Sequence, residues 1–163
     1  FDVVAPDIPV DPAEGLPFLR GLCMNEQPDV VVGTSMGGMY ALQMHGYKRI
    51  CVNPAFEMSN KSKVLTTGIH EYSNPRKDSS THFEITSDTI RHFAEMEEHQ
   101  FDAVTDVDRK QVWGMFADND TQVDEEPLFL QHYTQVIHFS GEHRLDEAAI
   151  KNVLVPLIHN IVQ

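Results

Sequence analysis

A serine flanked by glycines follows directly after a run of valines. Residues 33–38 read Gly-Thr-Ser-Met-Gly-Gly, which places Ser35 at the centre of a G-x-S-x-G pattern. Gly33 and Gly37 are expected to let the backbone turn sharply and to hold Ser35 in a strained conformation at the carboxyl end of a parallel strand. Because a helix is predicted to start at Met36, its free N–H groups would favour negative charge beside the hydroxyl. The pattern is typical of a nucleophile elbow.

Two other interpretations of this turn remain open. A glycine-rich connection can pack a helix closely against a strand without any chemistry, and a Rossmann-type loop can cradle a phosphate. Neither explains why a serine occupies the apex. The stretch also has neither the G-x-G-x-x-G spacing nor the lysine of a P-loop. We therefore favour a nucleophilic serine.

A nucleophilic serine needs a base to take its proton, and the chain offers nine histidines. His143 lies in a turn after a predicted strand at residues 134–139, so it is expected at the same edge of the sheet as Ser35. The others fall in a strand, helices, loops or the tail, where core or solvent-facing roles are common: His45, His70, His82, His92, His99, His132, His138 and His159. No His-Glu-x-x-His pattern or comparable ligand spacing occurs, so we predict no metal site.

The base in turn needs an acid, and an acidic loop follows another predicted strand, residues 111–117. The loop contains Asp118, Asp120 and Asp124. Asp120 precedes Val123 by three residues in a turn that the neighbouring asparagine can support, so we prefer Asp120. Asp118 comes first after the strand and is the alternative. Aspartates without a catalytic role are common in turns and helix caps.

The predicted site combines these residues. Ser35 is the nucleophile, His143 the base and Asp120 the acid, and the backbone N–H of Met36 is predicted to bind the oxyanion. The chain order Ser, Asp, His is the one used by sheets that carry a nucleophile elbow. Such chemistry requires no cofactor.

Strands and helices are predicted to alternate along most of the chain. The predicted strands cover residues 3–4, 30–32, 47–52, 111–117 and 134–139, and the predicted helices cover residues 12–22, 36–45, 87–96, 127–132 and 145–158. This order predicts an α/β fold with a mainly parallel sheet and helices on both faces, in a single domain over residues 1–163. Residues 57–108 are predicted to form a cap over the carboxyl edge; an ordinary crossover helix with a long loop is the alternative. Pro156 is expected to kink or restart the last helix.

The composition limits the partners. With 12 basic and 25 acidic residues the formal charge is −13, which argues against nucleic acid or an anionic membrane as partner and favours a neutral small molecule. No apolar run approaches the roughly 20 residues of a spanning helix. The two cysteines, Cys23 and Cys51, are too few for a disulfide framework. We therefore expect a cytoplasmic protein, and the sequence makes no prediction of oligomeric state.

Four motifs together resemble a known family. They are Gly33-Thr34-Ser35-Met36-Gly37-Gly38, Asn53-Pro54-Ala55, Asn119-Asp120-Thr121-Gln122-Val123-Asp124 and Gly141-Glu142-His143-Arg144. They are similar to those of small α/β-hydrolase esterases of the YqiA/YcfP type, over most of the chain. The resemblance implies a triad of Ser35, Asp120 and His143, no cofactor, and a short acyl ester or thioester as substrate.

The chain departs from that fold at its front. Proteins with this fold normally have an earlier strand, ending in a His-Gly loop that gives a second oxyanion donor, and no such segment precedes Phe1. We therefore expect the natural protein to have about 30 to 40 more residues before Phe1, the size of a strand plus a helix. A catalytically silent hydrolase-fold binding protein and an acyltransferase remain the alternative functions.

Overall fold

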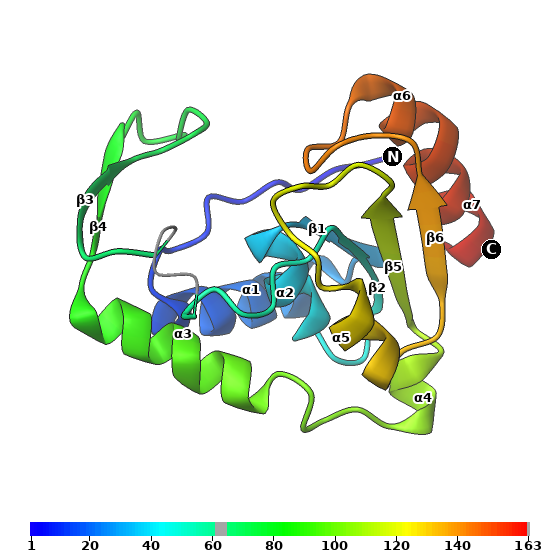
Figure 1. Ribbon diagram of the computed structural model, residues 1–163, viewed down its shortest axis with the longest axis horizontal. Helices are drawn as coiled ribbons and strands as arrows, with labels where there is room; N and C mark the ends of the chain where they lie inside the picture. The colour runs from blue at the N-terminus through cyan, green and yellow to red at the C-terminus, as the bar shows by residue number, and fades with distance from the viewer. Residues whose placement is uncertain (61–64, 163) are drawn as a thin grey trace. The chain divides into compact units, whose positions relative to one another are not determined.

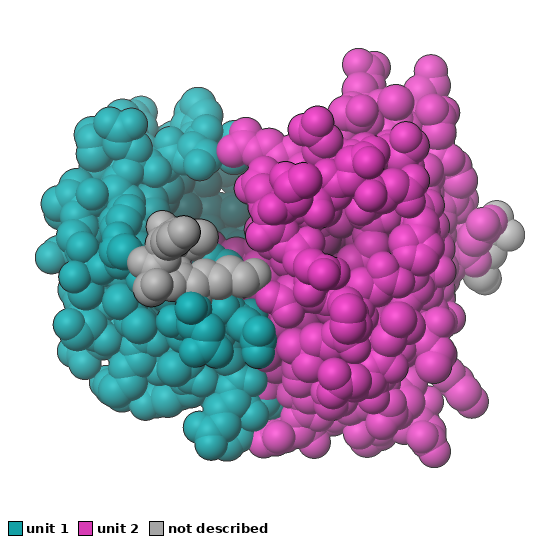
Figure 2. Space-filling view, viewed as in Figure 1, with its two compact units in different colours: residues 1–25, 57–99 teal, residues 26–56, 100–163 magenta. Residues whose placement is uncertain are grey.

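The computed structural model describes residues 1–60 and 65–162. The chain forms two compact units, which Figure 2 colours teal and magenta. The first unit comprises Phe1–Asn25 and Glu57–His99, and the second comprises Glu26–Phe56 and Gln100–Gln163. The single domain with a cap at residues 57–108 stays a prediction, and residues 61–64 of that segment lie outside the described residues.

A four-stranded parallel sheet forms the centre of the second unit (Figure 1). Its order is β1-β2-β5-β6, with bounds Val30–Thr34, Lys48–Val52, Val112–Ala117 and Val136–Phe139. All four were predicted from short β-branched or aromatic runs bounded by turn residues. Because Thr34 pairs with Val52 and Ala117 with Phe139, the carboxyl ends of neighbouring strands lie at the same edge of the sheet.

The C-terminal helices cover one face of this sheet. They are α6 (Glu147–Ala149), the π-helical turn η1 (Ile150–Leu154) and α7 (Val155–Val162). Their apolar side chains pack in one buried cluster with the strands: Ile50, Val52, Met115, Phe139, Ala149, Leu154, Leu157 and Ile161. Burial of this apolar surface fixes the helical segment on the sheet.

Two further helices, α2 (Met36–Leu42) and α5 (Glu126–His132), pack against strands of the sheet. Phe129 of α5 lies over Gly114, where an added Cβ would come within 2.8 Å of the Phe129 ring. In β2, Ile50 and Val52 belong to the C-terminal cluster, and Arg49 precedes them at an alternating position. The Arg49 guanidinium donates a hydrogen bond to the carbonyl oxygen of Leu42 in α2. Since successive side chains of a strand point to opposite faces, the helices lie on both faces, as predicted for this α/β fold.

The C-terminal helix is continuous through Pro156, with a π-helical turn just before it. The N–H of Val155 bonds the carbonyl of Ile150, five residues earlier. A proline has no N–H to donate and crowds the carbonyl four residues before it. A wider turn at this point absorbs the misfit and keeps the apolar face of α7 on the sheet.

A buried ion pair lies at the amino end of the sheet, where sequence patterns gave no hint of one. Arg49 is fully buried, and its guanidinium donates to Asp108 Oδ1 at 2.5 Å. Asp108 lies in the short helix α4 (Asp106–Arg109), and its Oδ2 accepts a hydrogen bond from the Tyr133 hydroxyl at 3.1 Å. Burial raises the pKa of Asp108, but hydrogen bonds from His45 and Arg49 outweigh it, so the pKa lies below its usual value.

The first unit contains most of α1 (Pro12–Glu26), a two-stranded antiparallel hairpin and α3 (Ser87–His99). The hairpin strands are β3 (Gly68–Glu71) and β4 (His82–Ile85), which sequence analysis did not predict. The helix predicted from residue 87 is confirmed. His92 of α3 bonds the Asp11 carboxylate through Nδ1 at 2.8 Å, which ties α3 to the start of α1.

The strand predicted at residues 3–4 is wrong. Residues 1–9 have no regular secondary structure, and Val3 and Val4 are 79% and 55% exposed. A strand needs a neighbour to pair its backbone groups. In this part of the chain the contacts are instead with a loop: Lys77 N donates to Asp7, and Arg76 donates to the carbonyl of Ile8.

No helix in the described part of the chain is long and apolar enough to cross a membrane.

Candidate active site

Ser35 lies between β1 and α2 in a strained backbone conformation, with φ +53° and ψ −123°. A positive φ at a non-glycine residue costs about 1 to 3 kcal/mol, so it persists only where neighbours enforce it. Ser35 N donates to the carbonyl of Val52 at 2.9 Å, and Ser35 O accepts from Ala55 N at 3.0 Å and from Gly38 N at 2.9 Å. The sharp, strained turn predicted at this serine is therefore present.

The glycines of the turn have different roles. A Cβ on Gly33 would lie 1.9 Å from the carbonyl oxygen of Gly37, and one on Gly38 would lie 2.9 Å from Pro54 Cβ. A Cβ on Gly37 would meet nothing within 4 Å. A side chain is therefore excluded by neighbouring atoms at Gly33 and Gly38, whereas the space beside Gly37 is open.

This difference predicts opposite effects for two alanine substitutions. Gly33→Ala is expected to lower the free energy of unfolding by about 3 kcal/mol or more, because the new methyl group overlaps backbone that has no room to move. Gly37→Ala, at a helical position in open space, is expected to be neutral or to stabilise by up to about 1 kcal/mol. Urea unfolding followed by circular dichroism compares the two. Equal midpoints would contradict the steric assignment.

Ser35, His143 and Asp120 form a hydrogen-bonded chain within the second unit. His143 Nε2 lies 2.9 Å from Ser35 Oγ, and His143 Nδ1 lies 2.7 Å from Asp120 Oδ2. In the neutral tautomer that suits this geometry, Nδ1–H donates to the carboxylate and the serine hydroxyl donates to Nε2. The His143 and Asp120 side chains are only 10% and 6% exposed. The structure thus brings together three residues that are far apart in the sequence.

The Asp120 carboxylate is fixed on both sides. While Oδ2 faces His143, Oδ1 accepts from Gln122 N at 2.8 Å and from Val123 N at 3.1 Å. Burial raises the pKa of Asp120, but the hydrogen bonds from His143 and these two N–H groups outweigh it, and the pKa lies below its usual value. Asp120 is therefore held as a carboxylate facing the imidazole.

Asp118, the alternative acid, lies differently. It is exposed, and its backbone N–H donates to the carbonyl of Phe139 at 2.9 Å. The next residue, Asn119, donates its N–H to Gly141 O at 3.1 Å. Through these bonds the backbone at Asp118 joins the loop of Asp120 to the turn that carries His143.

Met36 is the first residue of α2, so its N–H has no partner within the helix. Among the residues that the structure describes, no hydrogen bond engages this N–H, and Met36 is 37% exposed. A free N–H at a helix start, next to the nucleophile, suits the predicted oxyanion donor.

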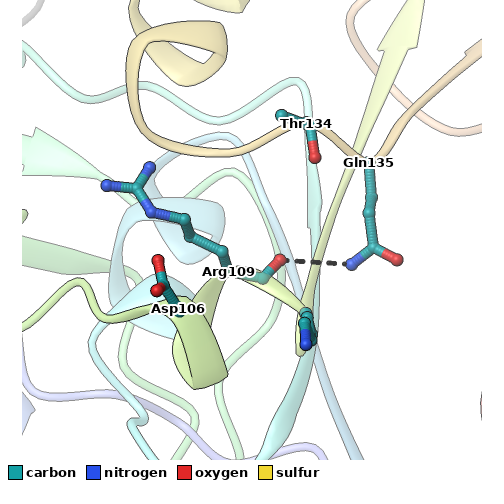
Figure 3. A pocket seen from close by; sticks show the side chains of 5 residues that line it. Asp106, Arg109, Thr134 and Gln135 are labelled. Atoms are coloured by element: carbon teal, nitrogen blue, oxygen red, sulfur yellow. Dashed lines mark hydrogen bonds between the residues drawn. The ribbon is translucent and has the colours of Figure 1, made fainter.

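Open pockets lie at both edges of the sheet of the second unit. One of about 410 Å³ adjoins Asp120 at the carboxyl edge of the sheet; its lining is Asn53, Phe116, Ala117, Asp118, Asp120, Val123, Asp124, Glu125, Glu126 and His138. The other, of about 420 Å³, adjoins the starts of β5 and β6 at the opposite edge (Figure 3); its lining is Asp106, Arg109, Lys110, Thr134 and Gln135. The Gln135 amide bonds the Arg109 carbonyl there. The carboxylates of the first cavity make the surroundings of Asp120 acidic.

The described residues include no group of three or more His, Cys, Asp and Glu side chains placed to hold a metal ion. Cys23 and Cys51 are both buried free thiols. Burial raises the pKa of Cys23, and it raises the pKa of Cys51 to about 12, although the nearby Arg49 lowers the latter.

The profile of an uncharacterised protein family, UPF0227, matches residues 3–159. The chain belongs to this family. The match confirms the family resemblance inferred from the four motifs. Among curated proteins, none matches the chain.

Solved structures resemble the whole chain at low sequence identity. A protein of Agrobacterium vitis S4 matches with TM-score 0.64 and 15% identity, over 94% of this chain and 69% of that one. The monoacylglycerol lipase of Paleococcus ferrophilus matches with TM-score 0.63 and 12% identity, over 93% and 75%. MGS-MChE2, an α/β hydrolase from the metagenome of Mar Chica lagoon sediments, matches with TM-score 0.53 and 11% identity, over 94% and 74%. The UPF0227 chain has the α/β-hydrolase fold.

Proposed function

We propose that this protein is a serine hydrolase that cleaves a carboxylic ester or thioester through an acyl-enzyme. The observation that carries the proposal is the chain of hydrogen bonds from Asp120 through His143 to Ser35, on a strained turn at the carboxyl edge of the sheet. A serine hydroxyl becomes a nucleophile when a base takes its proton and an acid stabilises the base, and His143 and Asp120 are proposed to act as this base and this acid. The fold, shared with proteins named as lipases and hydrolases, supports the proposal.

In the first half of the reaction, Ser35 Oγ attacks the acyl carbon while His143 Nε2 takes the hydroxyl proton. The tetrahedral intermediate places a negative charge on the former carbonyl oxygen, and the Met36 N–H is positioned to donate a hydrogen bond to it. Asp120 stabilises the imidazolium and keeps the ring in place. The bond to the alcohol or thiol then breaks, and His143 returns the proton to the leaving group.

In the second half, water replaces the leaving group. His143 takes a proton from the water, the hydroxyl attacks the acyl carbon, and the acid product leaves as Ser35 recovers its proton. An acceptor other than water would give an acyltransferase by the same steps.

The charge of the surroundings favours neutral substrates. Carboxylates line the cavity beside Asp120, and the whole chain has a formal charge of −13. A polyanionic leaving group would be repelled by this field at low ionic strength. We therefore propose a neutral acyl ester as substrate.

A fluorophosphonate probe tests the proposal, because it phosphonylates only activated serines. The parent protein is expected to be labelled at Ser35, located by mass spectrometry of the digested protein, and Ser35→Ala is expected to stay unlabelled. A p-nitrophenyl acyl ester then reports turnover. A parent protein that is folded yet unlabelled would refute the proposal and favour a catalytically silent binding protein. Labelling without hydrolysis would favour transfer to another acceptor.

Activity is expected to be lost in acid, because only a neutral imidazole can take the serine proton. The pKa of Asp120 is lowered, so its carboxylate stays ionised to a lower pH than that of a free aspartate, and it adds no second rise near neutrality. A single rise in kcat/KM is expected as the pH increases from acid to neutral. A flat profile over this range would contradict a histidine base.

A further inference from the structure

Asn53 lies just beyond the carboxyl end of β2 in an unusual setting for a polar residue. It is 2% exposed, and its φ is +41°, in the left-handed region that asparagine tolerates better than most residues. Asn53 lines the pocket beside Asp120, yet nearly all of its surface is covered by the protein. Its contacts within the protein decide what it does.

The side chain of Asn53 joins two loops that carry residues of the proposed site. Its amide Nδ2 donates to the carbonyl oxygens of His143 at 2.9 Å and Glu142 at 3.3 Å. Its Oδ1 accepts from the backbone N–H of Ala117 at 2.8 Å, at the end of the strand that leads to Asp120. The turn that carries His143 and the strand end before Asp120 therefore meet at one buried side chain.

The backbone around Asn53 also holds the nucleophile. Asn53 N donates to the carbonyl of Met115 in β5 at 2.8 Å. The residue before it, Val52, accepts from Ser35 N, and Ala55, which follows shortly after, donates to Ser35 O. The short segment around Asn53 thus touches all three parts of the proposed site.

We propose that Asn53 is a positioning residue that sets the place of the His143 imidazole between Ser35 and Asp120. The inference rests on the proposed function of these three residues. Without the amide donor, the carbonyl of His143 loses its partner and the turn is free to shift. A displacement of about 1 Å at a catalytic group lowers the rate about 10²-fold. Because the polar atoms of the Asn53 side chain bond backbone groups of this chain, kcat is expected to fall while KM stays nearly constant.

Two substitutions at Asn53 and one elsewhere test the proposal. Asn53→Asp keeps the size, tolerates the left-handed backbone and keeps an acceptor for Ala117, but it puts a carboxylate oxygen where the donor was. Asn53→Gly keeps the backbone conformation and removes both contacts. Asn152→Asp, on the exposed side of η1, makes the same charge change away from the site. It is the matched control.

In both Asn53 variants, kcat and the rate of phosphonate labelling are expected to fall about 10²-fold, as for a displaced catalytic group. KM is expected to stay within about threefold, since the hydrogen bonds that are removed join Asn53 to backbone groups of this chain. In Asn152→Asp all three quantities are expected to equal those of the parent.

The proton NMR resonance of the His143 Nδ1–H gives a second readout that needs no turnover. It reports the hydrogen bond from His143 to Asp120, and it is expected to shift or broaden in Asn53→Asp but not in Asn152→Asp. If the parent protein fails to react with the phosphonate, the proposed function fails, yet this resonance still tests the role of Asn53.

The proposal is overturned if Asn53→Asp matches Asn152→Asp in labelling rate and in the His143 resonance. A lower unfolding midpoint alone would then show a structural role. If neither Asn53 variant folds, the proposal is tested by hydrogen exchange in the parent protein. Its Asn53 side-chain amide hydrogens are expected to exchange with deuterium far more slowly than those of exposed Asn152. Equal exchange rates overturn the proposal.

Discussion

Replacement of Ser35 by alanine is expected to abolish hydrolysis of a p-nitrophenyl acyl ester. Loss of the nucleophile removes the attacking atom, and in other serine hydrolases it lowers kcat by on the order of 10⁶. The fold is expected to survive, because the strained backbone is held by Val52, Ala55 and Gly38 through main-chain bonds that the substitution leaves in place. The initial rate at saturating substrate, measured for the parent and the variant, gives the comparison.

Two controls make this result interpretable. The far-ultraviolet circular dichroism spectrum of Ser35→Ala should match that of the parent. Its free energy of unfolding, measured with urea, should agree with that of the parent within about 1 kcal/mol, as for loss of a single hydrogen bond. Purification of both proteins by a second, independent chromatographic step excludes a contaminating esterase. Turnover of the variant within tenfold of the parent would end the assignment of Ser35.

The elbow and the convergence of the loops could be predicted because both follow from local rules. A β-branched run before Gly33 predicts a strand, and the glycines around Ser35 predict a sharp turn. Parallel strands with short connections then force residues after different strands to one edge of the sheet. For this reason the sequence predicts that His143 and Asp120 lie beside Ser35, although more than 80 residues separate them from it along the chain.

Other features depend on contacts that no local pattern records. Arg49 looks like a solvent-facing charge in the sequence, yet it is fully buried because Asp108 lies against it. The space around each glycine also depends on distant atoms: Gly38 is crowded by Pro54, whereas Gly37 is open. The role of Asn53 is of the same kind, since its partners lie in two other loops. The sequence offers two signals for Asn53: its place directly after a predicted strand and its position in the motif Asn53-Pro54-Ala55.

The hairpin of the first unit was missed for a different reason. Its strands, β3 and β4, are four residues long, contain glycine, histidine and glutamate, and are mostly exposed, so they lack the apolar alternation that identifies a strand. The tyrosine and phenylalanine rings of Tyr72 and Phe83 pack at 4.6 Å, and Arg76 lies over Tyr72. Such cross-strand contacts stabilise a short hairpin without leaving a periodic pattern.

Asp120→Asn is expected to lower kcat by on the order of 10³ to 10⁴, as a neutral substitute for the acid does in other triads. The surroundings of Asp120 dictate how the amide would lie. Its oxygen would keep the hydrogen bonds from Gln122 N and Val123 N, which the carboxylate accepts through Oδ1. The amide NH₂ would therefore face His143 Nδ1 and donate to it. This stabilises the tautomer with its proton on Nε2, which cannot accept the proton of Ser35.

Asp118→Asn is the matched control, because it makes the same change of charge in the same loop. Asp118 is exposed, and the bond from its backbone N–H to Phe139 does not depend on its side chain, so kcat is expected to stay within about threefold of the parent. The pH profile gives a second comparison. The parent rate should rise with pH, whereas Asp120→Asn should stay slow at every pH at which it is folded, since His143 then has its proton on Nε2. If Asp118→Asn is the slower variant, the role of the acid belongs to Asp118, and the hydrogen bond between Asp120 and His143 serves the fold alone.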